Sequence, residues 1–199
     1  MPTKSVFDQD IVSLARWLVG AHLLVRGVGG IILETEAYGR DDPASHSFRG
    51  PGLRNAAMFG AAGSVYVYLS YGCHLCLNIV GRPGEAVLIR AIRPVNGLDL
   101  MAARRGRGPG ASDIGSGPGR VGQALGIRLA DNGAPVGLRV GSPVGSPVGP
   151  EGFVLTRPHP PSAPLLVGPR IGISRAADLP WRFGLPGATG LSRPFPPRT

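Results

Sequence analysis

Glycine and proline are so frequent in this chain that long helices and long strands have little room to form. The 199 residues include 32 Gly and 21 Pro, about a quarter of the total, and both residue types disfavour the interior of regular elements. They gather between residues 106 and 119 and again from residue 131 onward, which marks loops rather than a uniform low-complexity polymer. With 43% hydrophobic and 17% charged residues, the chain can still bury a core.

The segments between these breakers carry short helical and strand-like patterns. Apolar residues form one stripe along residues 8–20, which predicts a helix. Two β-rich runs flank Ser70-Tyr71-Gly72 within residues 64–80, which predicts a hairpin with Tyr71 near its tip. The other expected elements are strands at 21–26 and 31–38 joined by a turn at 27–30, a polar loop at 39–55, a strand at 86–92 closed by Pro94, helices at 98–105 and 118–125, a loop over the Gly-Ser-Pro-Val doublet at 141–148, and a last strand at 170–174. No boundary separates two domains, so we expect a single domain over residues 1–199, with a flexible loop at 106–119 and a flexible tail at 184–199.

The charge balance indicates a polyanionic partner. The formal net charge is +9, and Lys4 is the only lysine, so arginine carries nearly all of the positive charge. A GC-rich genome would explain the ratio of arginine to lysine, but not the excess over 12 acidic residues. Such a charge favours nucleic acid over a membrane surface, without distinguishing DNA from RNA. The sequence has no apolar run of membrane-spanning length and its first residues lack a signal-peptide core, so we expect a cytoplasmic protein.

Two carboxylates and a tyrosine share one face of the strand predicted at 31–38. Because side chains alternate along a strand, Glu34, Glu36 and Tyr38 point to one side. This combination matches a packed core poorly, and the chain contains only four glutamates. A solvated strand face is the alternative to a functional site. His46 follows in a loop, where it is either a site residue or simply exposed.

The predicted hairpin holds three of the four tyrosines of the chain. Tyr66 and Tyr68 share a strand face, and Tyr71 lies at the turn. An aromatic side chain on a protruding arm can wedge between base pairs or stack on a base; the alternative is two core tyrosines and one turn residue. Cys73 and Cys76 are three residues apart, so their thiols would diverge in a strand, and a zinc site would need further ligands. We therefore expect no metal.

Arginines flank these elements and could neutralise phosphates. A guanidinium group binds phosphate through two parallel hydrogen bonds, and each neutralised phosphate releases counterions. A scattered solvated surface is the alternative. The helix start at 116–120 could also bind a phosphate through its backbone N–H groups. The arginines in question are Arg49, Arg54, Arg90, Arg93, Arg104, Arg105, Arg107 and Arg120.

Taken in order, these motifs resemble the alkyladenine (3-methyladenine) DNA glycosylase family over roughly residues 10 to 183. The matching segments are E-T-E-A-Y (34–38), D-D-P-A-S-H (41–46), R-N-x-x-M-F (54–59), Y-V-Y-L-S-Y-G (66–72), Asn78-Ile79, V-L-I-R-A (87–91), S-G-P (116–118) and Q-A-L-G-I (123–127). The resemblance implies an α+β fold: a single mixed domain with a curved antiparallel sheet, peripheral helices and a protruding hairpin. The sequence departs from the family pattern at Gly52-Leu53, Cys73 and Arg93.

The resemblance also implies roles for individual residues. Glu36 would deprotonate the attacking water, and Arg90 would bind that water or the adjacent phosphate. Tyr38 would form one wall of the base pocket, His46 and Tyr68 the opposite wall, and Asn78 would disfavour the exocyclic amine of guanine. Tyr71 would fill the space left by the flipped nucleotide. The residues expected to contact DNA around it are Cys73, His74, Arg49, Arg54 and Arg120.

The expected activity is therefore the release of alkylated or deaminated purines from double-stranded DNA, of the 3-methyladenine, 7-methylguanine, hypoxanthine and ethenoadenine class. We expect a monofunctional enzyme, because a strand-nicking glycosylase uses an amine and Lys4 is the only lysine. We expect no cofactor, no obligate protein partner and a monomer. The alternatives are a non-catalytic module that binds damaged or bent DNA and, more distantly, an enzyme acting on RNA or free nucleosides.

Overall fold

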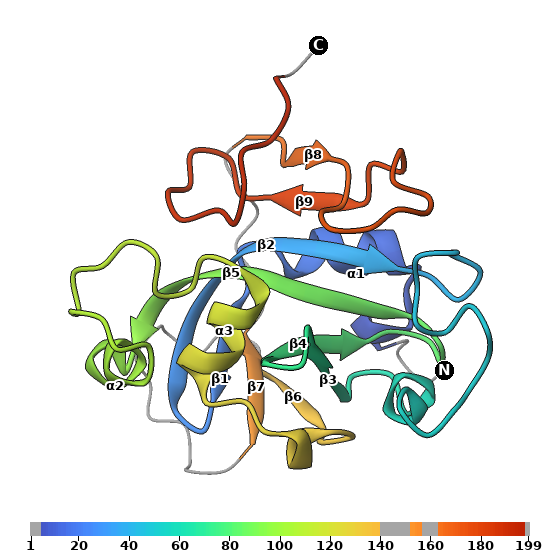
Figure 1. Ribbon diagram of the computed structural model, residues 1–199, viewed down its shortest axis with the longest axis horizontal. Helices are drawn as coiled ribbons and strands as arrows, with labels where there is room; N and C mark the ends of the chain where they lie inside the picture. Colours follow the sequence, from blue (N-terminus) through green and yellow to red (C-terminus); the bar gives the residue numbers. More distant parts are fainter. Residues whose placement is uncertain (1–4, 140–151, 157–162, 198–199) are drawn as a thin grey trace.

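The structure is a computed structural model that describes residues 5–139, 152–156 and 163–197. Lys4 and the doublet at 141–148 lie outside the described residues. A strongly curled, mostly antiparallel sheet forms the body of the molecule, and three helices lie around it (Figure 1). This arrangement confirms the predicted α+β class and a single domain. Within the described residues, no helix is long and apolar enough to cross a membrane.

Two long strands form the spine of the sheet. β2 (Val28–Tyr38) pairs antiparallel with β5 (Ala86–Asn96), and the register shifts around Glu34. The main path of the sheet runs β3-β4-β5-β2-β1-β7-β6, while β9 pairs with β2 and β8 pairs with β9. The remaining strands are β1 (His22–Val25), β3 (Val65–Ser70), β4 (His74–Val80), β6 (Val136–Arg139), β7 (Phe153–Thr156), β8 (Leu166–Gly168) and β9 (Arg182–Gly184). The other edge of β2 is thus shared, by β1 along its first residues and by β9 at Glu34–Glu36.

Helices cover the apolar faces of this sheet. α1 (Ile11–Leu18) begins where the Asp10 side chain accepts a hydrogen bond from the Ser13 N–H at 2.9 Å, and it buries Leu14 and Leu18 completely. α3 (Pro118–Leu125) packs beside β4 and β5, and α2 (Leu98–Arg104) packs against α3, β2 and β5. A Cβ atom at Gly122 would lie 1.9 Å from the Leu75 carbonyl oxygen, so only glycine allows α3 to approach β4 this closely. The short 3-10 turns are η1 (Val6–Asp8), η2 (Ala56–Phe59) and η3 (Leu129–Asp131).

The turn predicted at 27–30 is wrong, because β1 and β2 are joined by the two residues Arg26-Gly27 and β2 already begins at Val28. Both residues have positive φ, 50° and 81°, as a tight two-residue hairpin requires. The glycines that suggested the turn serve another purpose inside β2. A Cβ atom at Gly29 would lie 2.0 Å from the Leu23 carbonyl oxygen, and one at Gly30 would lie 1.9 Å from that of Arg93.

Two further predictions about strands are wrong. β5 does not close before Pro94 but continues to Asn96, and Pro94 pairs with Gly30. β4 pairs with β5 only at Ala86–Leu88, so Pro94 lies where one edge of β5 is open, and a proline there breaks no ladder. Residues 170–174 form a loop instead of the last strand. The predicted helices at 8–20, 98–105 and 118–125 and the hairpin at 64–80 are confirmed within a few residues.

Candidate active site

The two glutamates of β2 are completely buried, and they do share one face of the strand. Neither Glu34 nor Glu36 is accessible to solvent, and both accept hydrogen bonds from the buried Arg90 of β5. Thr35, between them, points the other way and donates a hydrogen bond to the Ala15 carbonyl at 2.9 Å. The alternation predicted from the sequence is therefore confirmed, whereas a solvated strand face is excluded.

The Glu36 carboxylate accepts a hydrogen bond at each of its two oxygens. Its Oε1 atom accepts from the backbone N–H of Ile171 at 2.7 Å, and its Oε2 atom accepts from the Tyr38 hydroxyl at 2.9 Å and from Arg90 at 3.2 Å. Burial raises the pKa of Glu36 above its usual value, although Arg90 and the Ile171 and Tyr38 hydrogen bonds act in the opposite direction. The result is a carboxyl group that binds a proton more readily than one in water, while Arg90 and the two hydrogen bonds offset part of the cost of burying its charged form.

Glu34 is bound even more tightly, and by residues from the end of the described chain. Its Oε1 atom accepts from Arg90 at 3.1 Å, from Arg182 at 3.0 Å and from the Ser192 hydroxyl at 2.7 Å. Its Oε2 atom accepts from the Ser192 backbone N–H at 2.6 Å. With three donors on Oε1 and one on Oε2, Glu34 is anchored within the chain and can hold Arg90 in place.

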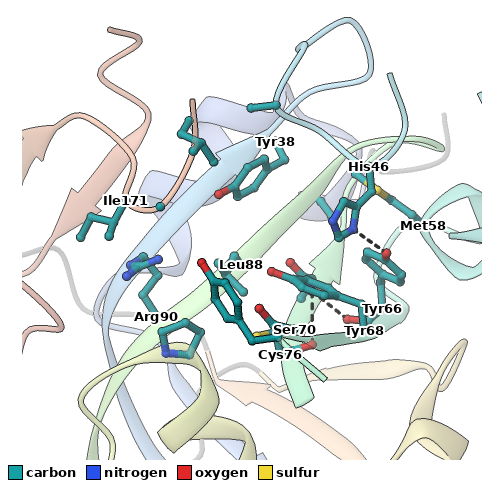
Figure 2. A pocket seen from close by; sticks show the side chains of 17 residues that line it. Tyr38, His46, Met58, Tyr66, Tyr68, Ser70, Cys76, Leu88, Arg90 and Ile171 are labelled. Atoms are coloured by element: carbon teal, nitrogen blue, oxygen red, sulfur yellow. Dashed lines mark hydrogen bonds between the residues drawn. The ribbon is translucent and has the colours of Figure 1, made fainter. Parts of the chain in front are cut away.

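A cavity of about 400 Å³ opens beside this cluster, within the size range of small-molecule sites. Figure 2 shows Tyr38 lying across the cavity from Tyr68, with Arg90 and Ile171 on the side away from His46. Glu36 is not part of the lining. Its carboxylate lies just behind the wall, where Tyr38 and Arg90 connect it to the cavity.

Aromatic side chains form the wall opposite Tyr38. The rings of His46 and Tyr68 meet edge to face with their centres 4.6 Å apart, and those of Tyr66 and Tyr68 are 5.7 Å apart. His46 Nδ1 shares a hydrogen bond of 2.8 Å with the Tyr66 hydroxyl. His46 is at the exposed rim of the cavity, and partial burial of its ring lowers its pKa. This shift favours the neutral form of the imidazole.

The floor of the cavity includes Asn78 and Cys76 of β4. The Asn78 amide donates hydrogen bonds to the backbone carbonyls of Tyr66 at 3.0 Å and of Cys76 at 3.4 Å. These bonds fix the side chain and leave its carbonyl oxygen as the group available to a ligand. Cys76 is buried, while Cys73 is exposed in the turn that precedes β4.

The residues expected to contact DNA lie at the mouth of the cavity or near it. Tyr71, at the tip of the β3–β4 hairpin, is 88% exposed and has a φ of 50°. Cys73 and His74 follow it and are also exposed. A second hollow, a groove of about 1210 Å³, runs along the outer side of the hairpin and is lined by Arg49 and Arg54 among others.

Arg120 lies apart from this group. It is on the first turn of α3 and pairs with Asp113 at 3.2 Å. Gly119 beside it packs closely against His74, since a Cβ atom there would lie 2.7 Å from the imidazole ring. The start of α3 therefore supports the hairpin turn, and Arg120 projects next to it.

Sequence reasoning missed a buried arginine that supports the site from behind. Arg170 pairs with Asp42 through both terminal nitrogens and donates to the Ala37 carbonyl at 2.9 Å. Its guanidinium lies 4.7 Å from the centre of the Tyr38 ring and 5.2 Å from that of Trp181. Arg170 also immediately precedes Ile171, whose N–H binds Glu36. In the sequence it was only the first residue of the strand predicted at 170–174, and nothing in the local pattern indicated its partner 128 residues away.

Comparison with known proteins identifies the relatives of this chain. Residues 5–189 match the family described as methylpurine-DNA glycosylase. A protein of Nitrosospira multiformis is 53% identical over 195 residues, covering 95% of this chain and 92% of its own length. Proteins of Rhizobium meliloti (50% identical, 95% of each chain) and Agrobacterium fabrum (47% identical, 98% of this chain and 93% of its own) are also similar. All three are named, provisionally, as 3-methyladenine DNA glycosylases. The chain that builds this aromatic cavity beside a buried carboxylate pair thus belongs to the methylpurine-DNA glycosylase family.

Proposed function

We propose that this DNA glycosylase of base excision repair extrudes alkylated or deaminated purines from double-stranded DNA and hydrolyses their N-glycosidic bond as a monofunctional enzyme. The observation that carries the proposal is the buried Glu36 carboxylate, held by Arg90, Tyr38 and the Ile171 N–H beside an aromatic cavity. A non-catalytic DNA-binding module would need neither the cavity nor a buried base, so both features favour the enzyme over that alternative.

The aromatic walls would receive the extruded base. A purine between Tyr38 on one side and His46 and Tyr68 on the other gains stacking on each face, worth about 1–3 kcal/mol per base. This is comparable to the few kcal/mol needed to unstack a base from the duplex. Electron-rich rings also favour N-alkylated purines, which carry positive charge, by cation–π attraction. Selectivity would come partly from this attraction and partly from the weaker stacking of damaged bases in the duplex.

Asn78 would contribute to selectivity from the floor of the cavity. Because its amide is committed to two backbone carbonyls, it offers a carbonyl oxygen in a fixed position. The amide has no room to turn without losing both hydrogen bonds. We expect this fixed side chain to disfavour guanine because the additional exocyclic amine would be crowded against it, although Asn78 offers that amine an acceptor.

Glu36 would act on water through the Arg90 side of the cavity. A water molecule bound by Arg90 would lie next to Oε2 of Glu36 once the Tyr38 hydroxyl yields part of its 2.9 Å hydrogen bond. Catalytic hydrogen bonds often reach their working geometry only in the complex. The raised pKa of Glu36 strengthens it as a proton acceptor. An N-alkylated purine leaves without prior protonation, so one carboxylate suffices where a neutral sugar leaving group requires two.

Tyr71 would occupy the gap in the duplex. Its ring is almost fully exposed on a tight turn, and it lines the mouth of the cavity. An aromatic wedge in this place holds neighbouring base pairs apart while the extruded nucleotide stays in the cavity. Cys73 and His74 would contact the DNA beside it, and Arg49, Arg54 and Arg120 would bind phosphates.

Base release from defined duplexes tests the proposed function. Duplexes carrying ethenoadenine, hypoxanthine or 3-methyladenine should lose the damaged base in a single turnover, and an undamaged duplex should not. Borohydride added during the reaction should trap no covalent adduct, because no amine takes part. Binding of these duplexes without any base release would overturn the enzyme in favour of the non-catalytic module.

A further inference from the structure

We propose that residues 50–55 form a second DNA-contacting element, with Leu53 at its tip placed against the strand opposite the extruded nucleotide. The proposal rests on the function proposed above and adds a contact on the other side of the hairpin. Its starting point is Leu53, which is fully exposed although leucine gains by burial.

The loop that carries Leu53 is held rigidly by a single side chain. The Asn55 amide donates hydrogen bonds to the carbonyls of His46 at 2.8 Å and Gly50 at 3.1 Å, and its oxygen accepts from the Gly52 N–H at 2.6 Å. Gly50 itself has a φ of 85°, which favours glycine in the turn. A loop fixed in this way presents Leu53 to solvent in one conformation, so binding needs little further ordering.

This loop and the hairpin face each other across the groove of about 1210 Å³. Leu53 and Tyr71 both line it, together with Leu69, which is 50% exposed on the outward face of β3. His46 and Tyr68 line both this groove and the base cavity. The groove is therefore continuous with the proposed base site and lies on the other side of the same aromatic wall.

The charge of the groove indicates the chemistry of its occupant. Arg49 and Arg54 flank Leu53 and are exposed, and neither forms an ion pair with a carboxylate of the described residues. Apolar side chains at the centre with unpaired arginines beside them fit a nucleic-acid strand, which presents apolar sugar and base surfaces next to phosphates. An apolar peptide would leave both guanidinium groups unused.

The position of the hairpin selects the strand. With Tyr71 wedged into the duplex, the damaged strand lies on the cavity side, where its nucleotide enters between Tyr38 and Tyr68. The complementary strand then lies on the opposite side of Tyr71, which is the groove side. Leu53 would meet this strand at the nucleotide that has lost its partner, and Arg49 and Arg54 would bind its phosphates.

Fluorescent base analogues can separate the two strands. The duplex carries a stable abasic-site analogue, with 2-aminopurine placed either directly opposite it or next to it on the same strand. At saturating wild-type protein, both probes should change their fluorescence. Leu53→Ala should lose most of the opposite-strand response and keep the same-strand response, because Tyr71 is intact. It should also bind this duplex about 10-fold more weakly and bind the single strand as the wild type does.

Leu100→Ala is the control, since Leu100 is a half-exposed leucine on α2 that does not line the groove. It should behave as the wild type with both probes. A normal opposite-strand response from Leu53→Ala would overturn the proposal, and so would an equal loss of both responses. Because the probes report contact and not base release, a wild-type protein that changes both probes but releases no base would contradict the proposed function and leave this inference standing.

Discussion

The interior and the rim of the site are built in opposite ways. Around Glu34 and Glu36, each carboxylate oxygen has a donor, and the side chains are closed off from solvent. Around Tyr71 and Leu53, large apolar side chains are exposed on turns, beside arginines that form no ion pair within the part of the chain that the structure describes. The hydrogen bonds of the buried carboxylates are made within the chain, whereas the exposed side chains at the rim are free to contact a partner. Changes to the interior should therefore affect chemistry and stability, and changes to the rim should affect DNA binding.

The largest effect is expected from Glu36→Gln. Glutamine keeps the size of the side chain but cannot accept a proton from water, so single-turnover excision should fall by about 10²–10⁴-fold. The affinity for an abasic-site duplex should change little, because Glu36 does not line the cavity. Excision at near the wild-type rate would show that Glu36 is not the catalytic base, and it would contradict the idea that the interior residues carry the chemistry.

Glu34→Ala should act on stability. The substitution leaves Arg90 and Arg182 buried without their shared carboxylate, which should lower the free energy of unfolding by about 3–5 kcal/mol. Urea denaturation monitored by Trp fluorescence measures the change. Asp113→Ala removes a partly exposed carboxylate that pairs with the exposed Arg107 and Arg120, so its stability should stay within about 1 kcal/mol of the wild type. Equal losses in the two variants would contradict a structural role for Glu34.

Tyr71→Ala should reduce DNA binding without affecting the fold. Loss of the wedge should weaken affinity for an abasic-site duplex by about 10–100-fold, the equivalent of about 1–3 kcal/mol of stacking. The melting temperature should not fall, because the side chain is 88% exposed. Fluorescence anisotropy and thermal denaturation of the same samples provide both readouts, and an affinity equal to the wild type would remove Tyr71 from the DNA interface.

Tyr38→Phe should shift the pH dependence of excision. The Tyr38 hydroxyl lowers the pKa of Glu36 by hydrogen bonding, so the pKa should rise when the hydroxyl is removed. Because Glu36 must be ionised to accept a proton, the acidic limb of the single-turnover profile should move to higher pH. Tyr71→Phe removes an exposed hydroxyl instead and should leave that limb unchanged. A limb that moves to lower pH in Tyr38→Phe would contradict the assignment of the limb to Glu36.

The smallest effect is expected at a single rim charge. Arg54→Gln should weaken binding of all duplexes alike and make the slope of log K against log salt about 0.9 less steep, as expected for one phosphate contact. Titrations at several salt concentrations measure the slope. Arg16→Gln is the control, because Arg16 on α1 lines neither the cavity nor the groove and its guanidinium lies over the Phe183 ring of β9. An unchanged slope would place Arg54 outside the DNA-binding face.

Local patterns predicted the parts of the site that lie within one element. Alternation along β2 placed Glu34, Glu36 and Tyr38 on one face, and the turn residues located Tyr71 at a hairpin tip. The partners that come from distant segments could not be predicted this way. Arg170, Ile171 and Ser192 meet β2 only because β9 pairs with it at Glu34–Glu36, and residues 170–174, expected as a strand, form the loop that reaches Glu36.

Glycine misled the prediction at one position for a physical reason. Glycine marks turns because it tolerates positive φ, but it is equally required where two backbones approach closely. Gly29 and Gly30 belong to the second case, which depends on neighbours that the sequence does not name. Pro94 is similar, since a proline ends a strand only if a neighbouring strand needs its N–H group.

The pairing of β9 with β2 has a consequence for the order in which the protein becomes active. During synthesis, Glu36, Arg90, the hairpin and the aromatic side of the cavity leave the ribosome first, while Arg182 and Ser192 follow about a hundred residues after Arg90. Until then Glu34 lacks two of its three side-chain partners, and Ile171 has no strand to hold it near Glu36. A partly made chain could therefore touch DNA with its hairpin before it could release a base, and base release would begin only when the C-terminal strands are in place.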